Sequence, residues 1–136
     1  MGHSYLGSWI NIGADTNTSD LKNTYGTIKV FVNGEQVDTK LQFVGLTMGD
    51  HSKTGINMMF DTGSVVGVSS NLYGADLPPK FIPSFSWGDA DGFATFSLEK
   101  SLDVARRMMA RRNVKMTNAY ENLIRHIYSM TEHERQ

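Results

Sequence analysis

The sequence of 136 residues contains no cysteine, and this absence excludes a disulfide framework, a thiolate nucleophile and a cysteine-ligated zinc site. No run of about 18 apolar residues occurs, so we expect no membrane span and no membrane partner. The opening residues, Met1-Gly2-His3-Ser4, lack the charged and apolar regions of a secretory leader. These absences together favour a cytoplasmic protein.

Charge of either sign is also not in excess, because 13 basic and 14 acidic residues leave a net charge of −1. This balance does not predict a nucleic-acid partner. The four histidines, at positions 3, 51, 126 and 133, lack the spacing of a zinc-binding set such as that of the hexapeptide-repeat carbonic anhydrases. The run Asp89-Ala90-Asp91-Gly92 lacks the further ligands of a calcium loop and reads as a turn. We therefore expect no metal in this chain.

Glycine, in contrast, is plentiful, and it accompanies a six-residue step. Leu6-Gly7 and Ile12-Gly13 lie six residues apart, and the step returns at Val44, Asp50, Ile56, Thr62 and Val68. This period fits neither an amphipathic helix nor an alternating strand, but it is typical of the stacked coils of a β-solenoid. The alternative is chance spacing in a glycine-rich all-β domain. Asp50 occupies a step where an apolar residue is expected, so either it pairs with an interior hydroxyl group or Lys53, or the register shifts there by one residue.

A polar insertion, residues 17–41, separates the two blocks of repeats. Within it, residues 28–32 and 35–38 alternate in hydropathy on either side of Asn33-Gly34. Asn-Gly between two such runs predicts a β-hairpin. We expect one coil to carry this hairpin as a protrusion.

The repeat ends near Gly74, and all three prolines follow between positions 78 and 83. Because proline removes a ladder donor, residues 77–96 are predicted to be extended chain packed along the solenoid wall. The aromatic residues of this segment could stack on a ligand base, but a role in covering the core is favoured. They are Phe81, Phe85, Trp87, Phe93 and Phe96.

Helical periodicity begins at Ser97. One apolar face contains Leu98, Leu102, Ala105 and Met109, and a second contains Leu123, Ile124, Ile127 and Met130. Asn118 and Glu121 have the spacing of a capping box for the second helix. The predicted organisation is therefore mainly β: a repeat domain over 1–76, a wall-packing segment over 77–96, and two helices over 97–136 that cap the solenoid.

The N-terminal segment contains the residue types of an acyl-transfer site. His3 could accept a proton from an attacking amine or hydroxyl, although on chemistry alone a plain surface histidine is the favoured interpretation. Asn11 could bind a substrate, and the backbone N–H groups around Gly13 and Ala14 could hold an oxyanion.

Three stretches resemble a known family: Gly2-His3-Ser4-Tyr5-Leu6-Gly7, Asn11-Ile12-Gly13-Ala14-Asp15-Thr16 and Asn23-Thr24-Tyr25-Gly26. They are similar to the C-terminal domain of bifunctional N-acetylglucosamine-1-phosphate uridyltransferase/acetyltransferases. They resemble still more closely the sugar nucleotidyltransferases of this architecture from Bacteroidetes-type bacteria. The resemblance runs from Gly2 to Gly74. It implies a left-handed parallel β-helix, a homotrimer, and acetyl-CoA or another acyl-CoA bound along the wall between subunits.

The resemblance also implies roles for individual residues. His3 matches the general base that acts on the sugar amine, Tyr5 the contact to the sugar phosphate, and Asn11 a substrate contact. Asn23 and Tyr25 match a downstream pair that lines the same site. The cofactor is expected along the walls formed by Gly13, Ala14 and Gly45.

Two functions remain open. In the first, the parent protein transfers an acyl group from CoA to an amino-sugar 1-phosphate. In the second, the domain is a non-catalytic trimerisation module of a glucose-1-phosphate-type nucleotidyltransferase. Three departures from the family pattern favour considering the second: the short spacing from His3 to Tyr5, Asp15 in the turn, and Thr24 between Asn23 and Tyr25. The family's nucleotide-binding loop is not found in these residues, so we expect a fragment that is inactive alone.

A basic cluster on the first predicted helix has two readings. It could contact the phosphates of CoA or of a nucleotide sugar. The favoured reading is a solvated face whose charges suit the helix C-terminus. Its members are Arg106, Arg107, Arg111, Arg112 and Lys115.

Overall fold

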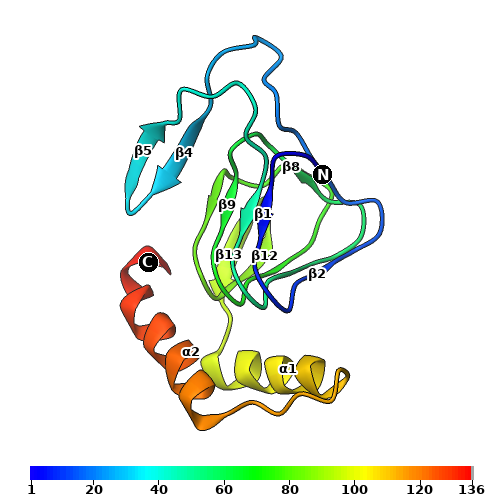
Figure 1. Cartoon of the computed structure of the whole chain (residues 1–136), viewed down its shortest axis with the longest axis vertical. Helices are drawn as coiled ribbons and strands as arrows, with labels where there is room; N and C mark the ends of the chain where they lie inside the picture. Colours follow the sequence, from blue (N-terminus) through cyan, green and yellow to red (C-terminus); the bar gives the residue numbers. More distant parts are fainter. Residues whose placement is uncertain (136) are drawn as a thin grey trace.

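Short parallel strands, arranged in three sheets, form the main body of the computed structural model, which describes residues 1–135 (Figure 1). The first sheet contains β1 (Tyr5–Leu6), β6 (Thr47–Met48), β9 (Val65–Val66) and β11 (Phe81–Ile82). The second contains β2 (Asn11–Ile12), β7 (Lys53–Thr54), β10 (Asn71–Leu72), β12 (Ser86–Asp89) and, antiparallel at its edge, β13 (Gly92–Thr95). The third pairs β3 (Asn17–Thr18) with β8 (Met59–Phe60). The chain visits the sheets in rotation, so each pass forms a coil stacked on the previous one, and the predicted mainly-β class is confirmed.

The interior of the coils repeats every six residues, but in a different phase from the one predicted. Strands β6 to β10 begin at residues 47, 53, 59, 65 and 71, and the second residue of each is buried. The predicted inward positions lie instead at turns, where Ile56 is 73% exposed. Asp50 is at such a turn and accepts a 2.7 Å hydrogen bond from the backbone N–H of Ser8, so its partner is neither an interior hydroxyl group nor Lys53. Turn residues recur with the same period as core residues, and a period alone cannot distinguish them.

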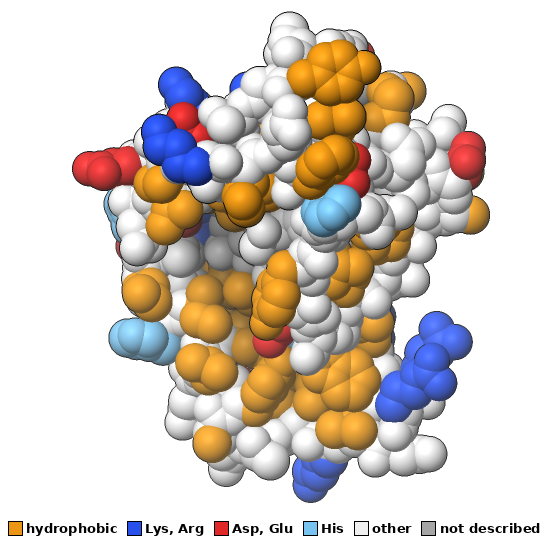
Figure 2. Space-filling view, turned by 45° about the horizontal axis from the view of Figure 1, so that its top comes forward, with side chains coloured by type: hydrophobic (Ala, Val, Ile, Leu, Met, Phe, Trp, Pro, Cys, Tyr) orange, Lys and Arg blue, Asp and Glu red, His pale blue; other side chains and the backbone are white. Residues whose placement is uncertain are grey.

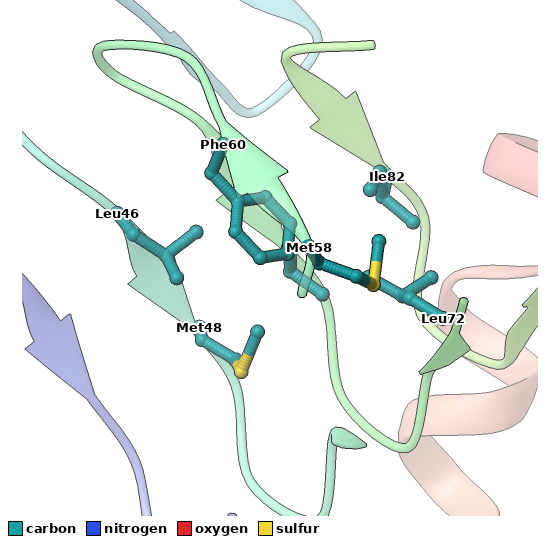
Figure 3. Packing of buried hydrophobic residues seen from close by; sticks show 7 residues of the cluster. Leu46, Met48, Met58, Phe60, Leu72 and Ile82 are labelled. Atoms are coloured by element: carbon teal, nitrogen blue, oxygen red, sulfur yellow. The ribbon is translucent and has the colours of Figure 1, made fainter. Parts of the chain in front are cut away.

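The core between the sheets is formed by aliphatic side chains, methionines and one phenylalanine. Figure 3 shows that these side chains, carried by strands or chain segments of different coils, point toward one another. Each of them is almost fully buried: Leu46, Met48, Met58, Phe60, Leu72 and Ile82. Burial of this kind stabilises a side chain by roughly 1.5–3 kcal/mol relative to exposure to water.

The predicted hairpin is confirmed. Strands β4 (Lys29–Val32) and β5 (Glu35–Asp38) pair in antiparallel fashion. Asn33 and Gly34 have φ values of 48° and 87°, the two positive values that a type I′ turn requires. The hairpin protrudes beyond the coils in Figure 1, and Phe31 contacts Phe81 with ring centroids 4.4 Å apart.

Residues 77–96 were predicted to be extended chain packed against the solenoid wall. In the structure they contribute strands of their own to the coils. Strand β11 pairs with β9, and β12 pairs with β10, both in parallel. Strand β11 lies at the edge of its sheet, where neighbouring prolines, which have no backbone N–H, are tolerated. Two aromatic residues of the segment, Phe85 and Phe96, are buried, as expected from their favoured role in the core.

Both predicted helices form, as α1 (Leu98–Ala110) and α2 (Asn118–Met130), followed by the 3₁₀ turn η1 (Glu132–Arg135). Leu102 of α1 and Ile124 of α2 pack with Phe85 and Phe96 in a second core cluster. The capping box at Asn118 is wrong, because the N-cap is Thr117, whose hydroxyl oxygen accepts a 3.2 Å hydrogen bond from the N–H of Tyr120. No helix in the described part of the chain is long and apolar enough to cross a membrane.

The helices extend alongside the coils and are not confined to the last one. Tyr120, near the start of α2, contacts His51 of the second coil, whereas Tyr128 contacts Phe85 after the fourth strand of the first sheet. Helix α1 lies below the coils in Figure 1, and its far end borders residues of the first coil. The periodicity of the sequence did not predict this lateral packing.

Candidate functional site

His3 forms a pair with Asp20. The Nδ1 atom of His3 lies 2.8 Å from the Oδ2 atom of Asp20, and the imidazole is 57% exposed. A carboxylate can only accept, so in the neutral ring this contact assigns the proton to Nδ1 and leaves the lone pair of Nε2 free to accept. An exposed imidazole held by a carboxylate is the arrangement of a general base with an orienting partner.

The backbone around His3 explains how the pair is positioned. His3 has a φ of 49°, and its carbonyl oxygen accepts a 2.8 Å hydrogen bond from the N–H of Gly45. A Cβ atom at Gly45 would overlap the carbonyl oxygen of Gly2 and the hydroxyl group of Ser4, so only glycine permits this approach. Gly45 therefore lies directly beside His3, and the close packing of these two segments requires a glycine at this position.

Asp20 was not singled out as a functional residue by sequence reasoning, which treated it only as a loop residue. It is 17 positions from His3. The two meet because the insertion returns to its starting point, where the N–H of Val44 donates a 3.0 Å hydrogen bond to the carbonyl oxygen of Asp20. No spacing rule within the sequence signals this contact.

The remaining sugar-site candidates lie on different parts of the surface. Tyr5, on β1, is 73% exposed. Tyr25, in the insertion, is 66% exposed, and its carbonyl oxygen accepts a hydrogen bond from the side chain of Gln42. Asn23 borders a separate hollow of about 320 Å³ that Lys22 and Lys80 also line.

Asn11 is on β2, in the second sheet, whereas Tyr5 is in the first. It lines a groove of about 620 Å³ between the second sheet and α1, together with Trp9, Lys53 and three arginines at the end of α1 and just after it. A single chain therefore does not bring Asn11 into contact with His3.

Gly13 contributes to the stacking of the first coil on the second. Its N–H donates to the carbonyl oxygen and the hydroxyl oxygen of Thr54, both at 3.1 Å. A Cβ atom at Gly13 would overlap the backbone of Gly55. The expectation that the Gly13 N–H is available to an oxyanion is thus wrong, because the neighbouring coil already accepts it. The adjacent Ala14 uses its carbonyl oxygen to accept from the N–H of Asn57 at 2.8 Å.

Metal-ligating side chains are dispersed. No group of three or more His, Cys, Asp or Glu residues converges within residues 1–135 in a way that could hold an ion.

The coils and the flanking helices define a mainly-β protein. Its sequence has distant similarity to bifunctional transferases that act on sugar phosphates. Over 73 residues, 54% of the chain, it is 29% identical to the bifunctional sugar-1-phosphate nucleotidylyltransferase/acetyltransferase of Sulfurisphaera tokodaii. Over 67 residues, 49% of the chain, it is 34% identical to the bifunctional protein GlmU of Methanocaldococcus jannaschii.

The aligned regions cover 18% and 16% of these two relatives, so the chain matches less than a fifth of either protein. No family model matches the chain. The comparisons therefore support the resemblance at the level of this general type of transferase.

Proposed function

We propose that this chain is the acyltransferase-like part of a sugar-phosphate-modifying transferase, folded as a left-handed parallel β-helix. The parent protein would transfer an acyl group from an acyl-CoA, such as acetyl-CoA, to the amine of an amino-sugar 1-phosphate. The observation that carries this proposal is the His3–Asp20 pair, with its 2.8 Å contact and its exposed imidazole. The similarity to two bifunctional proteins, one named as a nucleotidylyltransferase/acetyltransferase, supports the same chemistry.

In the proposed reaction the sugar amine attacks the thioester carbonyl carbon, so that a C–N bond forms and the C–S bond breaks. The Nε2 atom of His3 accepts the proton lost by the amine and returns it to the departing thiolate. Asp20 keeps the other ring nitrogen protonated and stabilises the imidazolium that forms transiently. Tyr5, Asn23 and Tyr25 are proposed to contact the sugar phosphate.

A homotrimer is proposed because one chain leaves the site incomplete. His3 precedes β1 and Tyr5 lies on it, in the first sheet. Asn11 lies on β2, in the second sheet, and Gly13 and Ala14 follow that strand. A neighbouring copy could bring its second wall to the first wall of this chain. Figure 2 shows hydrophobic side chains gathered in patches on one face, and Tyr5 and Phe43, at 73% and 46% exposure, are apolar surface near His3.

A second function is favoured by another observation. The Gly13 N–H is already accepted within the fold, and Asp15 places a carboxylate in the turn where an anionic cofactor is expected. These features suit a non-catalytic trimerisation module of a glucose-1-phosphate-type nucleotidyltransferase. In that case the His3–Asp20 pair serves only to close the base of the insertion.

Acyl transfer from acetyl-CoA to glucosamine 1-phosphate, measured in the intact protein, separates the two functions. We expect His3→Ala to lower the rate by about 10²–10⁴-fold, the usual contribution of a general base. Asp20→Asn should lower it while leaving the oligomer intact in light scattering. The matched control is His126→Ala, an exposed histidine of α2. Absence of transfer, or transfer that His3→Ala does not change, would reject the acyltransferase function.

A further inference from the structure

The groove between the second sheet and α1 gathers positive charge from two separate parts of the chain. It has a volume of about 620 Å³ and is lined by Trp9, Asn11 and Lys53 from the coils, by Arg107 from α1, and by Arg111 and Arg112, which follow α1. The whole chain carries a net charge of −1, so this concentration of cations is a local feature.

Lys53 is the unusual member of this set. Its ammonium group is half-buried and donates to two carbonyl oxygens, that of His51 at 2.8 Å and that of Trp9 at 3.5 Å. Burial lowers the pKa of Lys53 to about 8. Within residues 1–135 no carboxylate pairs with it, so a charge that is costly to desolvate is held without a counter-ion.

The arginines differ in how they are satisfied. Arg107 pairs with Asp103 of its own helix at 2.8 Å. Arg111 and Arg112 follow the last turn of α1 and form no ion pair with any residue that the structure describes. Favourable interaction with the helix C-terminus accounts for cations at these two positions. It does not account for Lys53, which comes from the coil wall and faces the same hollow.

We propose that this groove binds the diphosphate group of a small molecule. Phosphate oxygens would be held between the ammonium of Lys53 and the guanidinium groups of Arg111 and Arg112, which suit bidentate contacts to such oxygens. Asn11 contributes an amide that can donate to the same group, and the indole of Trp9 forms an apolar wall for the rest of the ligand. The site lies on the second sheet, away from the His3–Asp20 pair, and does not depend on the acyltransferase proposal.

The charge of Lys53 makes binding dependent on pH. An anion in the groove favours the protonated amine, so affinity is highest below pH 8 and falls as Lys53 loses its proton. The other charged or titratable groups around it are Arg107 and Asp103 of α1, Arg111 and Arg112 just after α1, Tyr120 of α2, and Asp50 and His51 of the adjacent turn. Of these the arginines keep their charge across this range, so Lys53 and not α1 sets the pH dependence.

Trp9 provides a local readout. The chain has two tryptophans, so Trp87→Phe leaves Trp9 as the single indole. Trp87 is 42% exposed and packs edge-on against Phe96, and phenylalanine keeps an aromatic ring at this contact. In this background we would titrate pyrophosphate, UDP and CoA at pH 7 and pH 9, following fluorescence and, in parallel, the heat of binding. Pyrophosphate tests the shared chemistry, and the two larger probes distinguish a nucleotide ligand from a CoA ligand.

We expect saturable binding of at least one probe at pH 7, and affinity lower by up to about tenfold at pH 9, the most that a free pKa near 8 allows. Lys53→Met and the double variant Arg111→Gln/Arg112→Gln should each weaken binding about tenfold or more, the scale of a hydrogen bond to a charged group. The control Lys100→Gln removes one charge from α1 outside the groove and should leave affinity unchanged. The proposal is overturned if no probe binds, if Lys100→Gln weakens binding as much as Lys53→Met, or if wild-type affinity is equal at the two pH values. The wild-type comparison does not depend on how well any variant folds.

Discussion

The Nε2 atom of His51 lies 2.8 Å from the hydroxyl oxygen of Tyr120, and this contact joins the second coil to α2 across 69 positions of sequence. The imidazole also stacks on Trp9, with ring centroids 6.3 Å apart, and it is only 4% exposed. Its Nδ1 atom has no hydrogen-bond partner in the described part of the chain. Because a buried N–H without an acceptor is rarer than a buried unpaired acceptor, Nε2 is assigned as the protonated nitrogen that donates to Tyr120. The coil and the helix are therefore linked through a neutral, desolvated ring.

This link predicts loss of stability in mild acid. Burial lowers the pKa of His51 to about 4, from about 6.5 in an unfolded chain. Between these two values the unfolded state binds more protons, so the free energy of unfolding falls as pH decreases from 6.5 to 4. We expect a decrease of about 2 kcal/mol from this group, measured by urea denaturation at pH 7 and pH 4.5.

His51→Phe keeps a ring beside Trp9 but cannot be protonated, so it should flatten this part of the pH profile. The exposed His126, replaced by Ala, is the control and should leave the profile as in the wild type. An identical acid sensitivity in His51→Phe would contradict the assignment.

Removal of the hydroxyl group from Tyr120 should cost about 1–2 kcal/mol of stability. Tyr120→Phe leaves the buried N–H of His51 without an acceptor, and an orphaned buried polar group carries a penalty of that size. Thermal unfolding at pH 7 measures the effect. Tyr5→Phe removes a hydroxyl group from a side chain that is 73% exposed and should change stability little. Equal effects of the two changes would show that the contact with His51 contributes nothing.

Lys53→Met is expected to stabilise the folded chain at neutral pH by about 1 kcal/mol, after allowance for the partial hydration of the amine. The folded pKa near 8 is below the unfolded value of 10.5, so the unfolded state binds more protons between these values. The stability of the wild type therefore rises from pH 8 to pH 10.5, and the advantage of the methionine variant should shrink over that range. Denaturant midpoints at pH 7 and pH 10 test this expectation, and a destabilised variant at pH 7 would contradict it.

Gly13→Ala should destabilise the stacking of the first two coils by about 1–3 kcal/mol, since the new methyl group would overlap the backbone of Gly55. Gly26→Ala is the matched control, because a Cβ atom there meets only the hydroxyl group of Thr24 at 3.8 Å. Calorimetric melting of the two variants separates a stacking role from a general effect of losing glycine. A Gly13→Ala protein as stable as Gly26→Ala would mean that the two coils move apart at this contact with no loss in the free energy of unfolding.

Features that depend on neighbouring residues were predictable from the sequence alone. The hairpin followed from Asn33-Gly34, whose positive φ values are a property of those two residue types. The two helices followed from apolar spacing, and the mainly-β class from a period of six that neither a helix nor an ordinary strand produces. Even the wrong phase of that period has a local cause, because turn and core residues recur at the same interval.

The tertiary structure alone decided which distant residues share a site. His3 meets Asp20 only because the insertion closes on itself, and His51 meets Tyr120 only because α2 runs back along the coils. Lys53 is an ordinary strand residue until the packed chain half-buries its ammonium group beside the carbonyl oxygens of Trp9 and His51. Burial and charge balance depend on the whole packed chain, so no local pattern of residues carries them.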